Sequence, residues 1–121
     1  MIKQDSSENL AKIVYLAIGS NLGDKRLNIE KAKSNLQDNH IRILKCSNDY
    51  ETNSWPNKNN PKFINIVLKV KTIQSPINLL KIINMIELKL GRIRSKKNAP
   101  RTCDIDIIDY DKKILNTRNR K

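Results

Sequence analysis

The sequence predicts an α+β sandwich in which two helices cover one face of a four-stranded antiparallel sheet. Four short apolar segments have the length and β-branched content of strands, and two longer segments have helical spacing of apolar residues. Their order along the chain is strand, helix, strand, strand, helix, strand. Short connections and right-handed crossovers make a ferredoxin-like topology, βαββαβ, the natural arrangement of such elements.

The first strand is predicted at residues 13–18, a continuous apolar run of the kind found in buried strands. Residues 19–23, Gly-Ser-Asn-Leu-Gly, follow it and predict a tight turn in which Asn21 takes a left-handed backbone conformation. This glycine pattern matches neither common phosphate-binding loop, so we do not read it as one.

A first helix should follow, with Asp24 at its N-cap and an apolar face formed by Leu27, Ala32 and Leu36. Polar residues 37–40 then form a turn. A second strand is expected from residue 41 to about residue 51.

The second half begins with an Asn-rich loop at residues 52–62 and a third strand at 63–71. Ser75 and Pro76 predict the start of the second helix, and Gly91 its end. Apolar residues recur at helical spacing on one face: Leu79, Ile82, Ile83, Ile86 and Leu90. The last strand is expected at residues 103–110.

Composition favours one small globular domain with an anionic partner. The chain has 121 residues and a net charge of +12, an excess that either attracts nucleotides or nucleic acid or keeps an Ile-rich domain in solution. We expect a flexible arm at residues 1–10, a single domain at 11–121 and a monomer in the cytoplasm. Cys46 and Cys103 are expected to be reduced core residues, and no apolar run approaches transmembrane length.

Two carboxylates on the last strand form the candidate metal site. Asp104 and Asp106 are two residues apart, so both side chains point to the same face, while Ile105 and Ile107 point to the other. Adjacent carboxylates repel unless a cation lies between them, and Mg²⁺ often binds one or two carboxylates together with substrate phosphates. The alternative is a solvated acidic face that pairs with nearby lysines.

A basic segment lies directly before this acidic pair and contains Arg92, Arg94, Lys96, Lys97 and Arg101. Guanidinium groups neutralise phosphate oxygens, often in bidentate fashion. Carboxylates that hold a metal next to arginines that bind phosphates are the components that phosphoryl-type transfer needs. The sequence therefore predicts a metal-bound polyphosphate substrate.

Four stretches together resemble the 6-hydroxymethyl-7,8-dihydropterin pyrophosphokinase family of folate biosynthesis. They are the run Ala-Ile-Gly-Ser-Asn-Leu-Gly at 17–23; Tyr50, Thr52, Trp55-Pro56 and Phe63-Ile64-Asn65; Ile86-Glu87 with Gly91-Arg92; and residues 97–108, Lys-Asn-Ala-Pro-Arg-Thr-Cys-Asp-Ile-Asp-Ile-Ile. The last run is the most specific. The four stretches occur in the family's order and span nearly the whole chain.

The resemblance implies transfer of the β,γ-pyrophosphoryl group of ATP to the hydroxymethyl oxygen of the pterin, with AMP as the other product. Asp104 and Asp106 would hold two Mg²⁺ ions. The residues implied for ATP and its phosphates are Arg92, Arg94, Arg101 and Glu87, of which Arg92 and Arg101 are also implied in catalysis. The residues implied for the pterin pocket are Thr52, Trp55, Phe63 and Asn65.

The resemblance has a limit at the C-terminal end. Family members typically continue with a His-Pro stretch, a further arginine and another helical segment, whereas no histidine follows Asp106 here. On this ground the domain is expected to lack the family's C-terminal segment and to bind ATP less tightly. Two alternatives stay open, a catalytically impaired pterin-binding paralogue or fragment and a basic RNA-binding module of the same fold. Scattered aromatic residues argue against RNA.

Overall fold

The computed structural model describes residues 10–54, 59–91 and 102–112. Its elements are β1 (Lys12–Ser20), α1 (Lys25–Asp38), β2 (Arg42–Cys46), β3 (Tyr50–Thr52), β4 (Phe63–Thr72), α2 (Pro76–Lys89) and β5 (Asp104–Tyr110). The antiparallel sheet has the order β2-β4-β1-β5, and the short β3 also pairs with β4. This order confirms the predicted ferredoxin-like α+β sandwich, with five strands instead of four.

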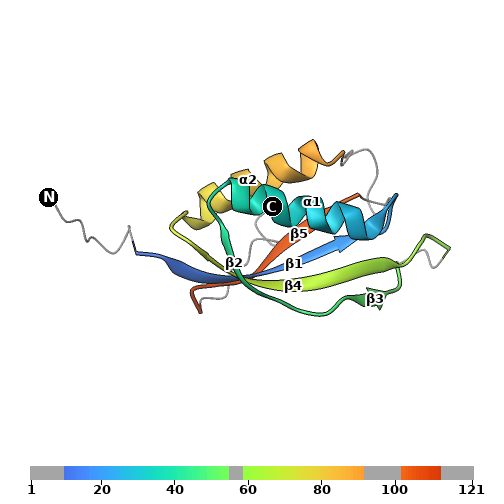
Figure 1. Cartoon of the computed structure of the whole chain (residues 1–121), viewed down its shortest axis with the longest axis horizontal. Coiled ribbons are helices and arrows are strands. Elements are labelled where there is room, and N and C mark those ends of the chain that lie inside the picture. Colours follow the sequence, from blue (N-terminus) through green and yellow to red (C-terminus); the bar gives the residue numbers. More distant parts are fainter. Residues whose placement is uncertain (1–9, 55–58, 92–101, 113–121) are drawn as a thin grey trace, which may run out of the picture.

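Both described helices lie on the same face of the sheet (Figure 1). The core between the layers consists mainly of isoleucine, leucine and valine, and β4 shows the alternation that such packing requires: its even-numbered residues from Ile64 to Thr72 are buried, and its odd-numbered residues are more accessible. No helix in the described ranges covers the opposite face of the sheet (Figure 1). We call that opposite side the open face.

The helix ends follow the predicted capping chemistry. The Asp24 carboxylate accepts a hydrogen bond from the Leu27 N–H at 3.2 Å, and the Ser75 hydroxyl accepts one from the Asn78 N–H at the same distance. Gly91 follows α2 with a φ of 94°, a backbone conformation that glycine tolerates best. All five residues predicted for the apolar face of α2 belong to the core or pack against it.

The predicted face of α1 was partly wrong. Ala32 and Leu36 are buried as expected, but Leu27 is 48% exposed and Ile29 is the residue that enters the core. Leu27 lies in the first turn of α1, where its N–H bonds to the Asp24 carboxylate and its side chain is exposed.

The first strand is longer than predicted, because Gly19 and Ser20 continue β1 instead of forming a turn. Gly19 pairs with Asn65 on β4 and Ser20 pairs with Ile64. The left-handed conformation expected at Asn21 occurs at Gly23, which has a φ of 76°. Asn21 is instead a buried residue that bonds through its side chain.

The predicted second strand is interrupted. It forms β2 and β3 on either side of Ser47, whose hydroxyl accepts a hydrogen bond from the Val67 N–H at 2.8 Å. The backbone N–H of Ser47 in turn donates to the Val67 carbonyl at 2.9 Å. Ser47 thus bonds to Val67 of β4 through both its side chain and its backbone. Regular pairing with β4 resumes at Tyr50.

The register between β1 and β5 shifts once, between Tyr15 and Leu16. Leu16 pairs with Ile107 and Tyr15 pairs with Asp109, so Ile108 is the extra residue of a β-bulge. Ile108 is accordingly 49% exposed, while Tyr110 beyond it is buried.

Three further expectations concern the cysteines, the N-terminal arm and membrane spans. Cys103 is buried as predicted, but Cys46 is exposed, so its assignment to the core was wrong. Residues 1–9 of the arm predicted at residues 1–10 lie outside the described residues, so this prediction is not tested. Neither α1 nor α2 has the length and apolar character needed to cross a membrane.

Candidate active site

A cleft of about 150 Å³ opens on one end of the open face. Four strands contribute to it, and the two predicted groups of site residues meet there. Its lining consists of Ala17, Ile18, Gly19, Thr52, Phe63, Asn65, Asp104 and Asp106. The structure therefore brings together five of the predicted site residues from distant parts of the sequence.

The strand register explains why these residues meet. Gly19 on β1 pairs with Asn65 of β4 on one side and with Asp104 of β5 on the other. Ala17 likewise pairs with Asp106. Two small residues thus form the floor between an acidic side on β5 and a polar and aromatic side on β4.

Gly19 is required for space. A Cβ atom at this position would lie 2.8 Å from Oδ1 of Asn65 and 3.2 Å from Cδ1 of Phe63. Both distances are shorter than ordinary van der Waals contact, so a side chain here would displace two predicted pterin contacts. The absence of a side chain at Gly19 lets Asn65 and Phe63 approach the middle strand.

Asn65 is held in one orientation by β3. Its Nδ2 atom donates to Oγ1 of Thr52 at 3.0 Å and to the carbonyl oxygen of Tyr50 at 3.2 Å. Because both amide protons are directed to β3, the Oδ1 atom faces Gly19. Thr52 and Asn65 therefore act as one polar unit on this side of the cleft.

The acidic pair is arranged as the alternation predicted. Asp104 and Asp106 are both half-buried and line the cleft, while Ile105 and Ile107 are buried towards the helices. In the described ranges no group of three or more His, Cys, Asp or Glu side chains gathers as a metal site. Two carboxylates fit Mg²⁺, which keeps several waters and completes its oxygen shell with substrate phosphates.

Glu87 supports the strand that carries the acidic pair. Its side chain is 2% exposed, and its Oε2 atom accepts a hydrogen bond from the backbone N–H of Ile105 at 2.8 Å. Ile105 lies between Asp104 and Asp106, so this bond ties α2 to the acidic segment of β5.

Asn21 is a site-supporting residue that the sequence pattern did not reveal. Its Nδ2 atom donates to Oγ of Ser54 at 2.9 Å and to the Pro61 carbonyl at 3.2 Å, and the Ser54 hydroxyl also donates to that carbonyl at 2.5 Å. Asn21 thereby links the end of β1 to both ends of the loop between β3 and β4. An asparagine directly after a strand is normally exposed, so the sequence does not indicate that Asn21 is buried, whereas the structure shows it 2% exposed.

Four predicted site residues lie outside the part of the chain that the structure describes: Trp55, Arg92, Arg94 and Arg101. The described cleft accordingly contains the predicted metal ligands and most of the pterin contacts. The arginine half of the predicted phosphate site stays a prediction.

Fold and cleft together define a small α+β sandwich with an acidic pair that faces a polar and aromatic pocket across a glycine. A family model described as 7,8-dihydro-6-hydroxymethylpterin-pyrophosphokinase (HPPK) matches residues 15–119. The match covers most of the chain, which therefore belongs to the HPPK family.

Curated relatives agree with this assignment. The chain is 44% identical over 110 residues to "Folic acid synthesis protein fol1" of Schizosaccharomyces pombe. The aligned region covers 90% of this chain and 15% of that protein. It is 40% and 34% identical to the 2-amino-4-hydroxy-6-hydroxymethyldihydropteridine pyrophosphokinases of Aquifex aeolicus and Bacillus subtilis. Each of these two alignments covers 87% of this chain. The chain therefore spans only about two thirds of these relatives, 65% of the Aquifex protein and 64% of the Bacillus protein.

Proposed function

We propose that the chain transfers the pyrophosphoryl group of ATP to 6-hydroxymethyl-7,8-dihydropterin, which yields AMP and the pterin diphosphate, in tetrahydrofolate biosynthesis. Membership of the HPPK family supports the reaction class. The observation that carries the proposal is the arrangement across Gly19, where Asp104 lies on one side and the Asn65–Thr52 unit on the other. A monomeric state and a cytoplasmic location stay predictions.

The β3–β4 side of the cleft suits the pterin. Phe63 offers an aromatic ring for stacking on a flat heterocycle, and stacking of this kind is favourable beyond the area it buries. Asn65 presents a carbonyl oxygen whose direction is fixed by the two hydrogen bonds of its amide nitrogen. A pre-oriented acceptor loses little entropy when it binds a ring N–H or amino group.

The β5 side of the cleft suits the metal-bound phosphates. Asp104 and Asp106 would hold two Mg²⁺ ions through their carboxylate oxygens. Bound Mg²⁺ would neutralise phosphate charge and make the attacking hydroxyl more acidic. The contribution of the chain itself is to place the acids next to the pterin side, so that the alcohol is held close to the phosphate that it attacks.

The remaining roles rest on the resemblance. Arg92 and Arg101 would bind the phosphates with Arg94 in support, and Trp55 would lie at the rim of the pterin pocket. The bond between Glu87 and Ile105 supports a positioning role for Glu87, through β5, in addition to the contribution to ATP binding that we predict.

A direct assay tests the proposal. The purified protein is incubated with Mg²⁺, ATP and 6-hydroxymethyl-7,8-dihydropterin, and AMP and the pterin diphosphate are quantified by chromatography. Asp104→Asn and Asp106→Asn keep the size of the side chain but remove its charge, so each should reduce AMP formation at least about a hundredfold, the scale of losing several kcal/mol of charge stabilisation.

Asp109→Asn is the matched control, because Asp109 lies on the same strand but does not line the cleft. It should retain activity, provided that circular dichroism shows all three variants folded. Equal AMP formation by the Asp104, Asp106 and Asp109 variants would show that the acidic pair does not hold the catalytic metal. Pterin binding without AMP formation by the unmodified chain would favour the impaired-paralogue alternative.

A further inference from the structure

The first turn of α1 carries two cations at the end where a helix favours anions. Lys25 and Arg26 occupy this turn, and no acidic residue follows the Asp24 cap there. Because the N-terminus of a helix carries a partial positive charge, these cations lower the stability of an isolated α1. The stability of the helix therefore does not account for them, whereas their contacts with other elements do.

Both cations reach the pterin side of the cleft. Arg26 forms an ion pair with Asp49, the residue directly before β3. The Nζ atom of Lys25 donates to the backbone carbonyl of Lys62, directly before β4, at 2.8 Å. The first turn of α1 is thus bonded to the chain at the start of each of the two strands that supply the predicted pterin contacts of the cleft.

The position of β3 depends on such contacts. This strand has three residues, all of them exposed, and in the described sheet it pairs with β4 alone. Short edge segments with little burial open at a low cost in free energy. The residues that anchor the two ends of β3 therefore determine where it lies: Ser54 after the strand bonds to Asn21, and Asp49 before it bonds to Arg26.

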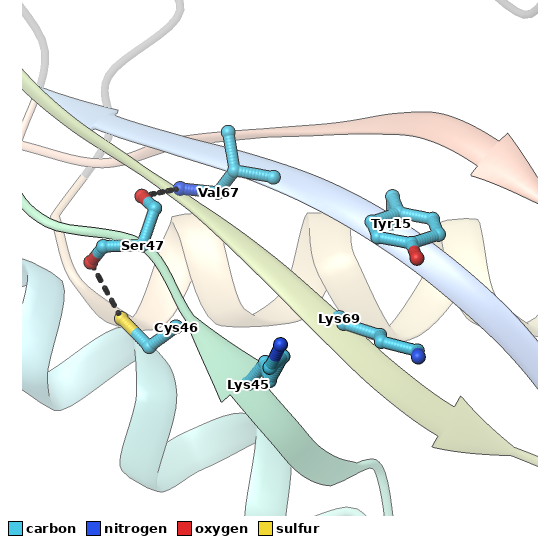
Figure 2. A pocket seen from close by; sticks show the side chains of 6 residues that line it. All are labelled: Tyr15, Lys45, Cys46, Ser47, Val67 and Lys69. Carbon is cyan, nitrogen blue, oxygen red and sulfur yellow. Dashed lines mark hydrogen bonds between the residues drawn. The ribbon is translucent and has the colours of Figure 1, made fainter.

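The chain enters β3 from a fixed point on β4. Figure 2 shows the Ser47 hydroxyl directed at the N–H of Val67, and the Ser47 N–H also donates to the Val67 carbonyl. Two residues, Asn48 and Asp49, separate Ser47 from the start of β3. Since Ser47 is fixed, the bond from Arg26 to Asp49 leaves this short connection little freedom and sets the place where β3 begins.

The place of β3 in turn sets the orientation of Asn65. Its Nδ2 atom donates to the Tyr50 carbonyl at 3.2 Å and to Oγ1 of Thr52 at 3.0 Å. Asp49 directly precedes Tyr50, so a displacement of the chain at Asp49 would lengthen the first of these bonds. The Oδ1 atom of Asn65 would then lose its fixed direction toward Gly19 and the cleft.

We propose that Arg26 is a positioning residue for the pterin, which acts through its ion pair with Asp49 by fixing β3 and thereby the side-chain amide of Asn65. The inference rests on the proposed function, because it assumes that the pterin binds next to Asn65. Arg26 itself lies on a helix and does not line the cleft.

The exposure of the ion pair determines which property should change when it is lost. The Arg26 side chain is 69% exposed and the Asp49 side chain 37%, and an ion pair this accessible adds little to the free energy of unfolding. A weak contact can still place a three-residue strand that has few other contacts. Loss of the pair should therefore appear in pterin binding and not in global stability.

Steady-state kinetics with saturating ATP and Mg²⁺ test the proposal. Arg26→Gln and Asp49→Asn should each raise the pterin KM about two- to fivefold, the range for loss of an exposed ion pair, with kcat unchanged. The combined variant should raise the KM no further than either single substitution, because both remove the same ion pair. Arg26→Lys keeps the charge and should keep the KM close to that of the unmodified chain.

Lys33→Gln is the matched control. Lys33 forms an ion pair with Glu30 within α1, so this substitution removes one cation and one ion pair from the same helix without a contact to β3. It should leave the pterin KM unchanged.

NMR of the protein without substrates separates this inference from the proposed function. The side-chain amide protons of Asn65 should shift and exchange faster in Arg26→Gln but not in Lys33→Gln, because only the first substitution releases β3. This measurement needs no reaction, so an inactive chain would refute the proposed function and still leave the role of Arg26 open to test.

Three results would overturn the role of Arg26. They are equal pterin KM values in Arg26→Gln and Lys33→Gln; a lower free energy of unfolding in urea for Arg26→Gln with an unchanged pterin KM, which would identify a purely structural contact; and unchanged Asn65 amide signals in Arg26→Gln.

Discussion

Gly19 shows how a missing side chain determines the shape of the site. It lies in the middle of three paired strands, and its pairing partners are a predicted pterin contact and a predicted metal ligand. A larger residue here would not disturb the backbone conformation, because the φ of Gly19 is not positive. The cost of a substitution is therefore steric and falls on Asn65 and Phe63.

Gly19→Ala should weaken pterin binding at least about tenfold and lower the free energy of unfolding by about 1–3 kcal/mol, the usual cost of overpacking. Calorimetric titration with the pterin and urea unfolding measure the two effects. Gly23→Ala is the control: Gly23 has a positive φ, so the substitution strains the backbone, but it does not contact the cleft. Unchanged pterin affinity in Gly19→Ala would show that the pterin does not use Asn65.

At Glu87, a single side-chain oxygen, Oε2, accepts the hydrogen bond that joins α2 to β5. Glu87→Ala should lower the free energy of unfolding by about 1–3 kcal/mol, because the buried Ile105 N–H loses the acceptor on α2. Glu87→Gln keeps an acceptor oxygen and should cost clearly less. Urea unfolding of both variants measures the difference, and equal losses would show that the bond to Ile105 is not what stabilises β5.

At the scale of elements, the Asn21 side chain, directly after β1, bonds to Ser54 and Pro61 near the two ends of the loop between β3 and β4. Asn21→Ala removes the hydrogen bonds to Ser54 and Pro61 and should lower the free energy of unfolding by about 1–3 kcal/mol. The pterin KM should rise as Thr52 loses its fixed position, while amide exchange in residues 53–62 should accelerate.

The control for Asn21 is Asn28→Ala. Asn28 bonds to Ser20 and Leu22 within the same turn but does not reach the loop between β3 and β4. Accelerated exchange of the loop in both variants would contradict the specific role of Asn21.

Sequence reasoning was most accurate where a local pattern determines the element. The caps Asp24 and Ser75 and the periodic face of α2 were correct, because capping and apolar spacing act within one or two turns. It was wrong at Gly19–Ser20 and at the break at Ser47, because pairing with β4 decides both positions. A turn-forming composition cannot reveal a partner strand that lies 20 or more residues away.

The site follows the same rule. Alternation on one strand is enough to place Asp104 and Asp106 on a common face, and this prediction is confirmed. The bond from Asn65 to Thr52 and the bonds of Asn21 join segments that lie far apart in the sequence, so no local pattern predicts them.

For the molecule as a whole, the Tyr110 hydroxyl makes the free energy of unfolding depend on pH above pH 10. Its hydroxyl donates to the Gln74 carbonyl at 2.6 Å, which joins the end of β5 to the segment before α2. Burial, with a smaller contribution from Asp111, raises the pKa of Tyr110 above its ordinary value of 10.0. The folded protein therefore holds the phenolic proton more tightly than the unfolded chain does.

Tyr110→Phe should lower the free energy of unfolding by about 0.5–1.5 kcal/mol near pH 8 through loss of this hydrogen bond. Because the folded pKa is raised, the contribution of Tyr110 is fully present below pH 10 and declines as the pH rises through the folded pKa. The gap between the two proteins should narrow above pH 10. Urea unfolding at several pH values measures it, and a constant gap would contradict the linkage.

The bulge at Ile108 has a consequence for how the chain can change in evolution. If Ile108 paired regularly with Tyr15, Asp109 would be opposite Val14 and would face the core, whereas the bulge keeps Asp109 opposite Tyr15 on the open face. The bulge lies beyond the acidic pair, whose pairing with Ala17 and Gly19 is set before the shift. Losing Ile108 would restore a regular ladder without moving Asp104 or Asp106, so this point of β5 can absorb a change in length that would be destructive two residues earlier.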